Sequence, residues 1–314
     1  MTMKPMKYSA LAVLSAAALV AGCGGGSDKK TGGSGEPTST DPIALLKSVN
    51  TKVDNQQPVK VDLNMTLSAS EKPTNPQLAT FLDKPITIKL SGPSDTKNKK
   101  TDLTFSVVAG PVNVSGEIRQ VGEDGFVAVN NKWYKLDPGT LSGKSTTDAS
   151  SKLDTQKLLD AVGDPAKLIK NAKVDGVEDI GGIKSDHVSG DIDIAELLAA
   201  AGRVADASGQ SSNTSVEQLK TASEQLKKYI DNAKMDVWIG QSDHQLHRAK
   251  LDTAIKLDDA TAKQAGLKGA ALTIDIQSVP TTTPTVTAPT DTSPISDLTS
   301  NLGSLLSGLG GSTP

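Results

Sequence analysis

The sequence of 314 residues is poor in several residue types, and each shortage excludes a class of protein. Its single cysteine excludes a disulfide framework and a metal cluster built on thiolates. Aromatic residues amount to 3%, too few for a surface that stacks bases or sugar rings. The net charge of −3 leaves no basic footprint for nucleic acid. Hydrophobic residues make up only 36%, which indicates that part of the chain lies outside any core.

The N-terminal segment is typical of an export signal. Lys4 and Lys7 precede an apolar run over residues 10–20, which is too short to span a bilayer, and small residues lead into Cys23. The tetrapeptide Val-Ala-Gly-Cys resembles a bacterial lipobox, in which the cysteine thiol is joined to a diacylglycerol and the chain is cut before it. We therefore predict a lipoprotein signal peptide over residues 1–22 and lipid attachment at Cys23.

This attachment implies a location as well. Two or three acyl chains on Cys23 exceed the single chain that gives only marginal membrane binding. The expected location is the extracytoplasmic face of the cell membrane, with the protein anchored rather than spanning. The alternative is an ordinary secretory cut site that happens to contain a cysteine.

Low-complexity segments flank the central part of the chain. Residues 23–40 are rich in Gly, Ser, Thr and Lys, which predicts a flexible tether. Residues 281–314 are rich in Thr, Pro and Ser, which predicts a disordered tail. A faint apolar stripe between Ile295 and Leu309 leaves a membrane or partner helix as the alternative for the tail. One folded domain is then expected over residues 41–280.

Strict alternation predicts strands through most of this domain. In residues 59–67, Val59, Val61, Leu63, Met65 and Leu67 alternate with polar residues, as in a half-buried antiparallel strand. Similar runs predict strands at 86–90, 103–107, 112–118, 126–129, 132–136, 172–180, 184–191, 235–239, 246–255 and 272–279. Asn130-Asn131 and Gly181-Gly182 predict two hairpin turns.

Capping signals predict helices between the two groups of strands. Asp41-Pro42 and Asp164-Pro165 are helix openings, the second leading to Leu168 and Ile169. Asp193 and Glu196 form a capping box, and Gly202 is placed to end that helix. Further helices are predicted after Asp154 and over residues 216–230. Together these elements predict an α+β domain, a large antiparallel sheet with helices gathered on one face.

The sequence carries no catalytic motif. Residues 139–145 resemble a phosphate-binding loop but have three residues between the glycines where four are needed. The three histidines are His187, His244 and His247, and the last two are expected on opposite faces of a solvated turn, unable to share a metal. No serine or cysteine nucleophile has the required local pattern. We expect no enzyme activity, no cofactor and no metal site.

Several segments resemble the mycobacterial-type lipoprotein family that includes LppX, LprA, LprF and LprG. The residues 174–192 resemble the family's hairpin that precedes a helix, and residues 237–251, with Val237-Trp238-Ile239 and Leu246-His247-Arg248, resemble a second hairpin. Trp133-Tyr134 resembles an aromatic strand. The likeness covers about residues 41–279, with a polar insertion at 203–215.

The resemblance implies a curved half-barrel sheet with helices packed on its concave face around an apolar cavity. It also implies binding of an acylated lipid or glycolipid, carriage of that lipid across the cell envelope, and a membrane transporter as a further partner. The inward-facing cavity candidates are Val61, Leu63, Met65, Ile88, Leu103, Phe105, Val114, Ile118, Leu197, Leu198 and Val237. A filled core is the alternative, which would make the protein a structural or interaction lipoprotein of the envelope.

Overall fold

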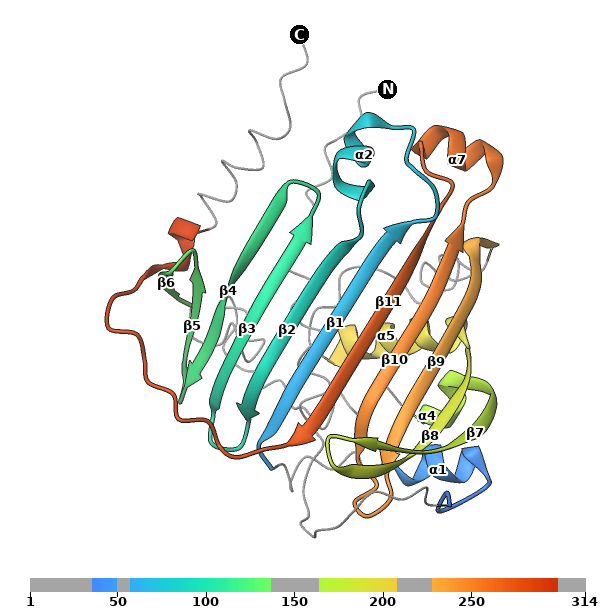
Figure 1. Cartoon of the computed structure of the whole chain (residues 1–314), viewed down its shortest axis with the longest axis horizontal. Helices are drawn as coiled ribbons and strands as arrows, with labels where there is room; N and C mark the ends of the chain where they lie inside the picture. The colour runs from blue at the N-terminus through green and yellow to red at the C-terminus, as the bar shows by residue number, and fades with distance from the viewer. Residues whose placement is uncertain (1–35, 50–56, 137–163, 208–227, 299–314) are drawn as a thin grey trace.

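The computed structural model describes residues 36–49, 57–136, 164–207 and 228–298. Within them, twelve strands form one open sheet in the order β12-β6-β5-β4-β3-β2-β1-β11-β10-β9-β8-β7, with β12 and β7 at its edges (Figure 1). The strands are β1 (Val59–Ala69), β2 (Ile86–Asp95), β3 (Lys100–Ala109), β4 (Val112–Val121), β5 (Asp124–Val129), β6 (Lys132–Lys135), β7 (Ile169–Ile180), β8 (Ile183–Ile192), β9 (Ile230–Gly240), β10 (Leu246–Lys256), β11 (Gly269–Pro280) and β12 (Ser293–Pro294). Pairing is antiparallel except between β12 and β6.

The helices are few and short. They are α1 (Pro42–Ser48), α2 (Pro76–Leu82), α4 (Pro165–Leu168), α5 (Ile194–Ala207) and α7 (Asp259–Ala265). Helix α1 lies at the β7–β8 end of the sheet, α5 lies behind the sheet, and α2 and α7 lie together beyond the strand ends (Figure 1). This arrangement confirms the predicted α+β class with a large, open antiparallel sheet.

Local sequence signals account for most of these elements. The Asp41 carboxylate accepts a hydrogen bond from the Ile43 amide at 2.9 Å, and Asp164 caps α4 in the same way. Asn130 and Asn131 adopt φ values of 53° and 62°, which a two-residue hairpin turn requires, so the turn predicted there is confirmed. The second predicted turn, at Gly181-Gly182, also joins two strands with positive φ at both glycines.

Some predicted boundaries are wrong. Helix α5 begins as predicted, because Asp193 accepts hydrogen bonds from the Ala195 and Glu196 amides, but it continues through Gly202 to Ala207. A glycine inside a helix costs about 1 kcal/mol and ends the helix only when other interactions favour a cap. Ile169, predicted in the helix of Asp164-Pro165, is instead the first residue of β7.

Helices α2 and α7 were not predicted. Helix α2 carries Leu78, Phe81 and Leu82 at helical spacing but is only seven residues long, and α7 has no large apolar residue. Their caps were nonetheless visible in the sequence. Asn75 precedes a proline at the start of α2, while Asp258 caps α7 and Gly266 ends it with a φ of 66°. The helix predicted after Asp154 lies outside the described residues, as do residues 1–35 with Cys23. Of the helix predicted over 216–230, residues 216–227 lie outside them, residues 228 and 229 are helical, and Ile230 is instead the first residue of β9.

The described parts of the predicted tether and tail make contacts with the sheet. At the end of the predicted tether, the Thr38 amide donates to the buried Asp186 carboxylate at 3.2 Å, and Gln241 donates to the Glu36 carbonyl at 3.0 Å. After β11, residues 281–298 run along the strand ends and add β12 beside β6 (Figure 1). The described parts of both segments therefore contact the sheet, and the flexibility of the tether and the tail stays a prediction.

Candidate functional site

One face of the sheet, called the inner face here, carries an unbroken band of apolar side chains. Strand pairing places one row of them across eight strands: Phe105, Leu90, Leu63, Ile276, Ala249, Val237, Val188 and Val174. A parallel row consists of Val114, Val107, Ile88, Met65, Ile274, Leu251 and Met235. Because residues two apart in a strand share a face, these rows make one continuous aliphatic surface.

The sheet brings together most of the predicted cavity residues. The nine that lie in strands share the inner face: Val61, Leu63, Met65, Ile88, Leu103, Phe105, Val114, Ile118 and Val237. Leu197 lies on α5, where 37% of its surface is exposed, and the side chain of Leu198 lies outside what the structure describes. The role of these residues in binding stays a prediction.

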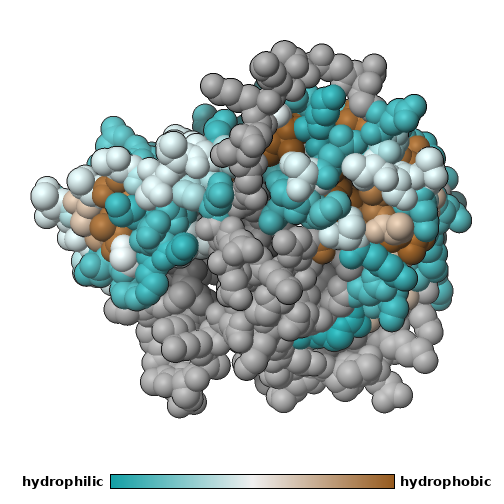
Figure 2. Space-filling view, turned by 90° about the horizontal axis from the view of Figure 1, so that it is seen from below, coloured by the Kyte–Doolittle hydropathy of each residue, from teal (hydrophilic) through white to brown (hydrophobic). Residues whose placement is uncertain are grey.

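Burial along the inner face is uneven. At the β7–β9 end, Val188, Val237 and Ile239 pack against Leu45 and Leu46 of α1, and all five are at most 4% exposed. In the centre, Leu63, Met65, Ile88, Phe105 and Val114 are only half-buried. From below, hydrophobic residues show between polar ones on the side where α1 and β7–β9 lie (Figure 2). The centre of the inner face is therefore an apolar surface that the described residues cover incompletely.

A buried contact between His247 and Asp243 closes the turn between β9 and β10. His247 is fully buried, with Nε2 at 3.0 Å from the Asp243 Oδ2 and Nδ1 at 3.1 Å from the Ser278 carbonyl. Burial would raise the pKa of Asp243, but the His247 hydrogen bond and the Gln245 amide hold it below its ordinary value. The prediction of a solvated turn is correct for His244, which is exposed, and wrong for His247.

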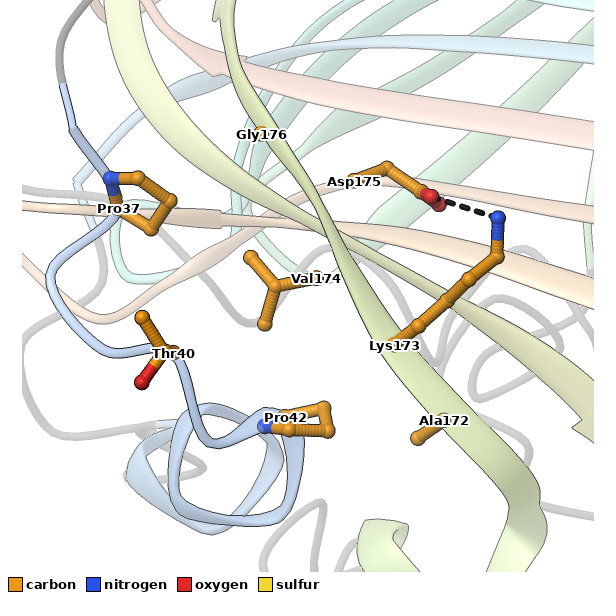
Figure 3. Close-up of a pocket in the computed structure, with 8 residues that line it drawn as sticks. All are labelled: Pro37, Thr40, Pro42, Ala172, Lys173, Val174, Asp175 and Gly176. Atoms are coloured by element: carbon orange, nitrogen blue, oxygen red, sulfur yellow. Dashed lines mark ion pairs between the residues drawn. The ribbon is translucent and has the colours of Figure 1, made fainter.

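A shallow groove of about 440 Å³ lies beside the first described residues. Pro37, Thr40 and Pro42 form one wall, and residues 172–176 of β7 form the other (Figure 3). Val174 points toward Pro37 and Thr40, while the ion-paired Lys173 and Asp175 point away from them (Figure 3). The groove is within the size range of ligand pockets but is lined by few polar groups that could orient a ligand.

Two observations bear on contact with a membrane. In the short basic segment at residues 97–100, Lys99 pairs with Glu123 in an exposed turn. No helix in the described residues is long and apolar enough to cross a bilayer. The membrane anchor at Cys23 lies outside the described residues and stays a prediction.

The fold and this face define a class: an open, mostly antiparallel sheet with an aliphatic inner face and few helices. Among solved structures, the chain is similar to LprF from Mycobacterium bovis, with a TM-score of 0.36 and 15% identity over 81% of this chain and 100% of that chain. It is also similar to the lipoprotein LppX from Mycobacterium tuberculosis, with a TM-score of 0.34 and 15% identity over 79% of this chain and 97% of that chain. LprF and LppX are two members of the lipoprotein family that the hairpins resemble.

A third similar structure is a DUF1329 family protein from Desulfovibrio piger, with a TM-score of 0.21 and 13% identity over 76% of this chain and 92% of that chain. No protein-family model matches the chain, and no curated protein matches it. At these identities and TM-scores the likeness is partial, so any conclusion about function has to come from this chain's own residues.

Proposed function

We propose that the protein is a membrane-anchored, non-catalytic lipoprotein that binds an acylated lipid or glycolipid on the inner face and carries it across the cell envelope. The observation that carries this proposal is the band of aliphatic rows whose central residues are only half-buried. Such a surface offers no hydrogen bonds and no charge. It therefore suits hydrocarbon chains rather than sugars, peptides or nucleotides.

The physical driving force is the removal of acyl chains from water. Each methylene group moved from water into an apolar site contributes about 0.8 kcal/mol. The rows run across the strands, so a chain lying along one row contacts successive half-buried aliphatic side chains such as Ile88, Met65 and Ile274. A polar headgroup would stay at the margin of the face, where water can solvate it.

The predicted anchor fits this role. If Cys23 is held in the membrane, the chain between it and Glu36 reaches at most roughly 45 Å when fully extended. Glu36 and Thr38 are fastened beside Asp186 and Gln241, at the end of the sheet that carries α1. That end would then stay close to the bilayer surface, from which lipid is loaded.

The test compares two tryptophan substitutions on neighbouring residues of β1. Leu63 is half-buried on the inner face, while Asn64 is exposed on the opposite face. We expect Leu63→Trp to reduce uptake of a fluorescent diacyl phospholipid from vesicles at least fivefold, because the added ring occupies the acyl site. Asn64→Trp should leave uptake unchanged. Circular dichroism checks that both variants are folded.

Mass spectrometry of bound lipid completes the test. In the full chain carrying Cys23→Ser, no covalent lipid can attach, so any acyl lipid extracted from the purified protein was bound without a covalent bond. Absence of such lipid, together with equal uptake by the wild type and both tryptophan variants, would overturn the proposal. That result would favour the alternative, a scaffold or accessory lipoprotein that has a filled inner face.

A further inference from the structure

Three potential metal ligands meet on the outer face of the sheet, opposite the aliphatic band. They are Asp175 of β7, His187 of β8 and Asp236 of β9, and one ligand atom from each lies within 4.8 Å of the other two. The His187 Nε2 is 2.9 Å from the Asp236 Oδ1 and 4.0 Å from the Asp175 Oδ2. The cluster combines an imidazole with two carboxylates, which is a set of ligands that divalent transition metals prefer.

Strand register assembles the cluster from distant parts of the chain. Asp236 pairs with Ser189, which places it diagonally across from His187 on the same face. On the other side, the pairing of β7 with β8 is irregular between Val174 and Gly176, so Asp175 is an extra residue opposite β8. Gly176 has a φ of 136°, a conformation that favours glycine. Such bulges redirect a side chain and occur often beside functional sites.

The ring of His187 is held in one orientation by two further contacts. Its Nδ1 lies 3.0 Å from the Glu178 Oε1, and its plane stacks on Trp238 with a centroid distance of 4.4 Å and an angle of 12°. When Nδ1 donates its proton to Glu178, the lone pair of Nε2 faces two carboxylates. Histidines that bind metals commonly donate their other ring nitrogen to a carboxylate in this way.

We propose that Asp175, His187 and Asp236 bind a zinc ion. An ion with ligand bonds of about 2.1 Å in tetrahedral geometry needs ligand atoms about 3.4 Å apart. The two distances from His187 Nε2, 2.9 and 4.0 Å, lie on either side of that value. Asp175 is exposed, so water can take the fourth position. In place of the present hydrogen bond between His187 Nε2 and Asp236, a zinc ion is shared by the imidazole nitrogen and the two carboxylates.

Of the neighbouring positive side chains, Arg248 and Lys250 are engaged with other carboxylates, whereas Lys173 pairs with Asp175 itself. Arg248 makes two hydrogen bonds to Asp275, at 2.9 and 2.6 Å. Its guanidinium group lies over the ring of Trp238, which also stacks on His187. Lys250 pairs with Asp252 at 2.6 Å. The competing contacts are on Asp175, whose Oδ1 pairs with Lys173 at 2.7 Å and whose Oδ2 accepts a hydrogen bond from Ser189. A zinc ion at Oδ2 displaces the Ser189 hydrogen bond and leaves the Lys173 pair in place.

Zinc titration of the purified full chain, followed by calorimetry, tests the proposal. We expect one zinc ion per chain, with the affinity lowered at least tenfold in His187→Gln and in the isosteric Asp236→Asn. Glu178→Ala keeps all three ligands but removes the acceptor at Nδ1, and it should lower the affinity by roughly ten- to a hundredfold. His244→Gln, in the exposed turn after β9, is the matched control and should bind zinc as the wild type does.

Tryptophan fluorescence locates the ion. The chain has two tryptophans, so Trp133→Phe leaves the emission of Trp238 alone, against the ring of His187. Cobalt bound at the site should quench this emission, and zinc should displace the cobalt and restore it. Absence of stoichiometric binding, or binding of equal affinity in folded His187→Gln and Asp236→Asn, would overturn the proposal. Equal affinity in the variants would mean that the ion binds elsewhere. Absence of binding would mean that hydrogen bonds alone satisfy the cluster.

Discussion

The β7–β9 end of the inner face and its centre carry the same kinds of aliphatic side chain but bury them to different extents. At the end, Leu45 and Leu46 of α1 cover Val188 and Val237, which are almost fully buried. In the centre, Leu63, Met65 and Ile88 are half-buried, although Leu90 and Val61 beside them are buried. The same pattern of residues therefore forms a packed core in one region and an apolar surface in the other, and the covering helices make the difference.

This contrast indicates that two regions of one sheet have different roles, one in stability and one in binding. A packed cluster stabilises the fold, since close-packed interiors lose stability when even one methylene group is removed. A half-buried surface contributes less to stability and remains able to exchange water for a ligand. We infer that the β7–β9 end provides most of the stability of the sheet, whereas the centre contributes less and is available for binding.

The largest expected effect comes from truncating the packed end. Leu46 is 1% exposed, so Leu46→Ala should lower the free energy of unfolding by about 2–5 kcal/mol, through lost burial and the cavity left behind. Leu63→Ala removes the same atoms from the half-buried centre and should cost less than half as much. Urea unfolding of both variants measures the difference.

A volume-conserving substitution is the control for this pair. Leu46→Met retains most of the buried volume and should cost less than about 1.5 kcal/mol. Equal losses for Leu46→Ala and Leu63→Ala would show that the centre of the inner face is packed as tightly as the end, which would remove the contrast and with it the main support for lipid binding.

The buried hydrogen bond between Asp243 and His247 at the β9–β10 turn should have a smaller effect that depends on pH. Asp243→Asn weakens the hydrogen bond to the buried His247 and should cost about 1–3 kcal/mol at neutral pH. Because the folded-state pKa of Asp243 lies below its ordinary value of 3.8, the carboxylate stabilises the fold above that pH. This stabilisation is lost as the pH falls through the folded-state pKa.

Unfolding curves at several pH values measure the effect. The difference between the wild type and Asp243→Asn should be constant above the ordinary pKa of 3.8 and should shrink below it. Asp124→Asn is the control, because Asp124 and Lys135 form an ion pair whose side chains are about half exposed, worth at most about 1 kcal/mol. A difference that does not change with pH would show that the charge of Asp243 is unimportant.

Most of the sheet was predictable because its signal is local. Alternation in residues 59–67 reflects one buried and one solvated face, and the asparagine pair at 130–131 satisfies the positive φ values of its turn. Strand ends were predicted too short, as for β2, where residues 91–95 are polar but still pair with β1 or β3. Hydrogen bonding to neighbours, which the pattern does not reveal, extends the strand.

The side-chain clusters were not predictable, because they depend on register between distant strands. The irregular pairing between Leu246 and Arg248 lies at His247, a position that alternation placed in a solvated turn. Likewise, nothing local links Asp175, His187 and Asp236, which come together only through the pairing of β7, β8 and β9. The sequence signal available was a histidine within a strand, surrounded by acidic residues in neighbouring predicted strands.

The smallest expected effect lies where the extended segment that follows β11 passes the end of β2. Thr283 donates to the buried Asp95 carboxylate at 2.5 Å, and Asn98 donates to the same group through its amide nitrogens. Burial raises the pKa of Asp95, but these hydrogen bonds more than offset it and lower the pKa. Thr283→Val keeps the shape of the side chain and removes one donor.

We expect Thr283→Val to cost about 0.5–1.5 kcal/mol in urea unfolding and to make residues 281–298 easier to cleave by protease. Thr282→Val, at an exposed neighbouring position, is the control and should change neither measurement. A packed helix such as α1 stabilises by burying apolar area, whereas this segment relies on single hydrogen bonds and on β12. If Thr283→Val cost as much as Leu46→Ala, the segment after β11 would stabilise the fold as much as α1 does. Stability would then not be concentrated at the β7–β9 end.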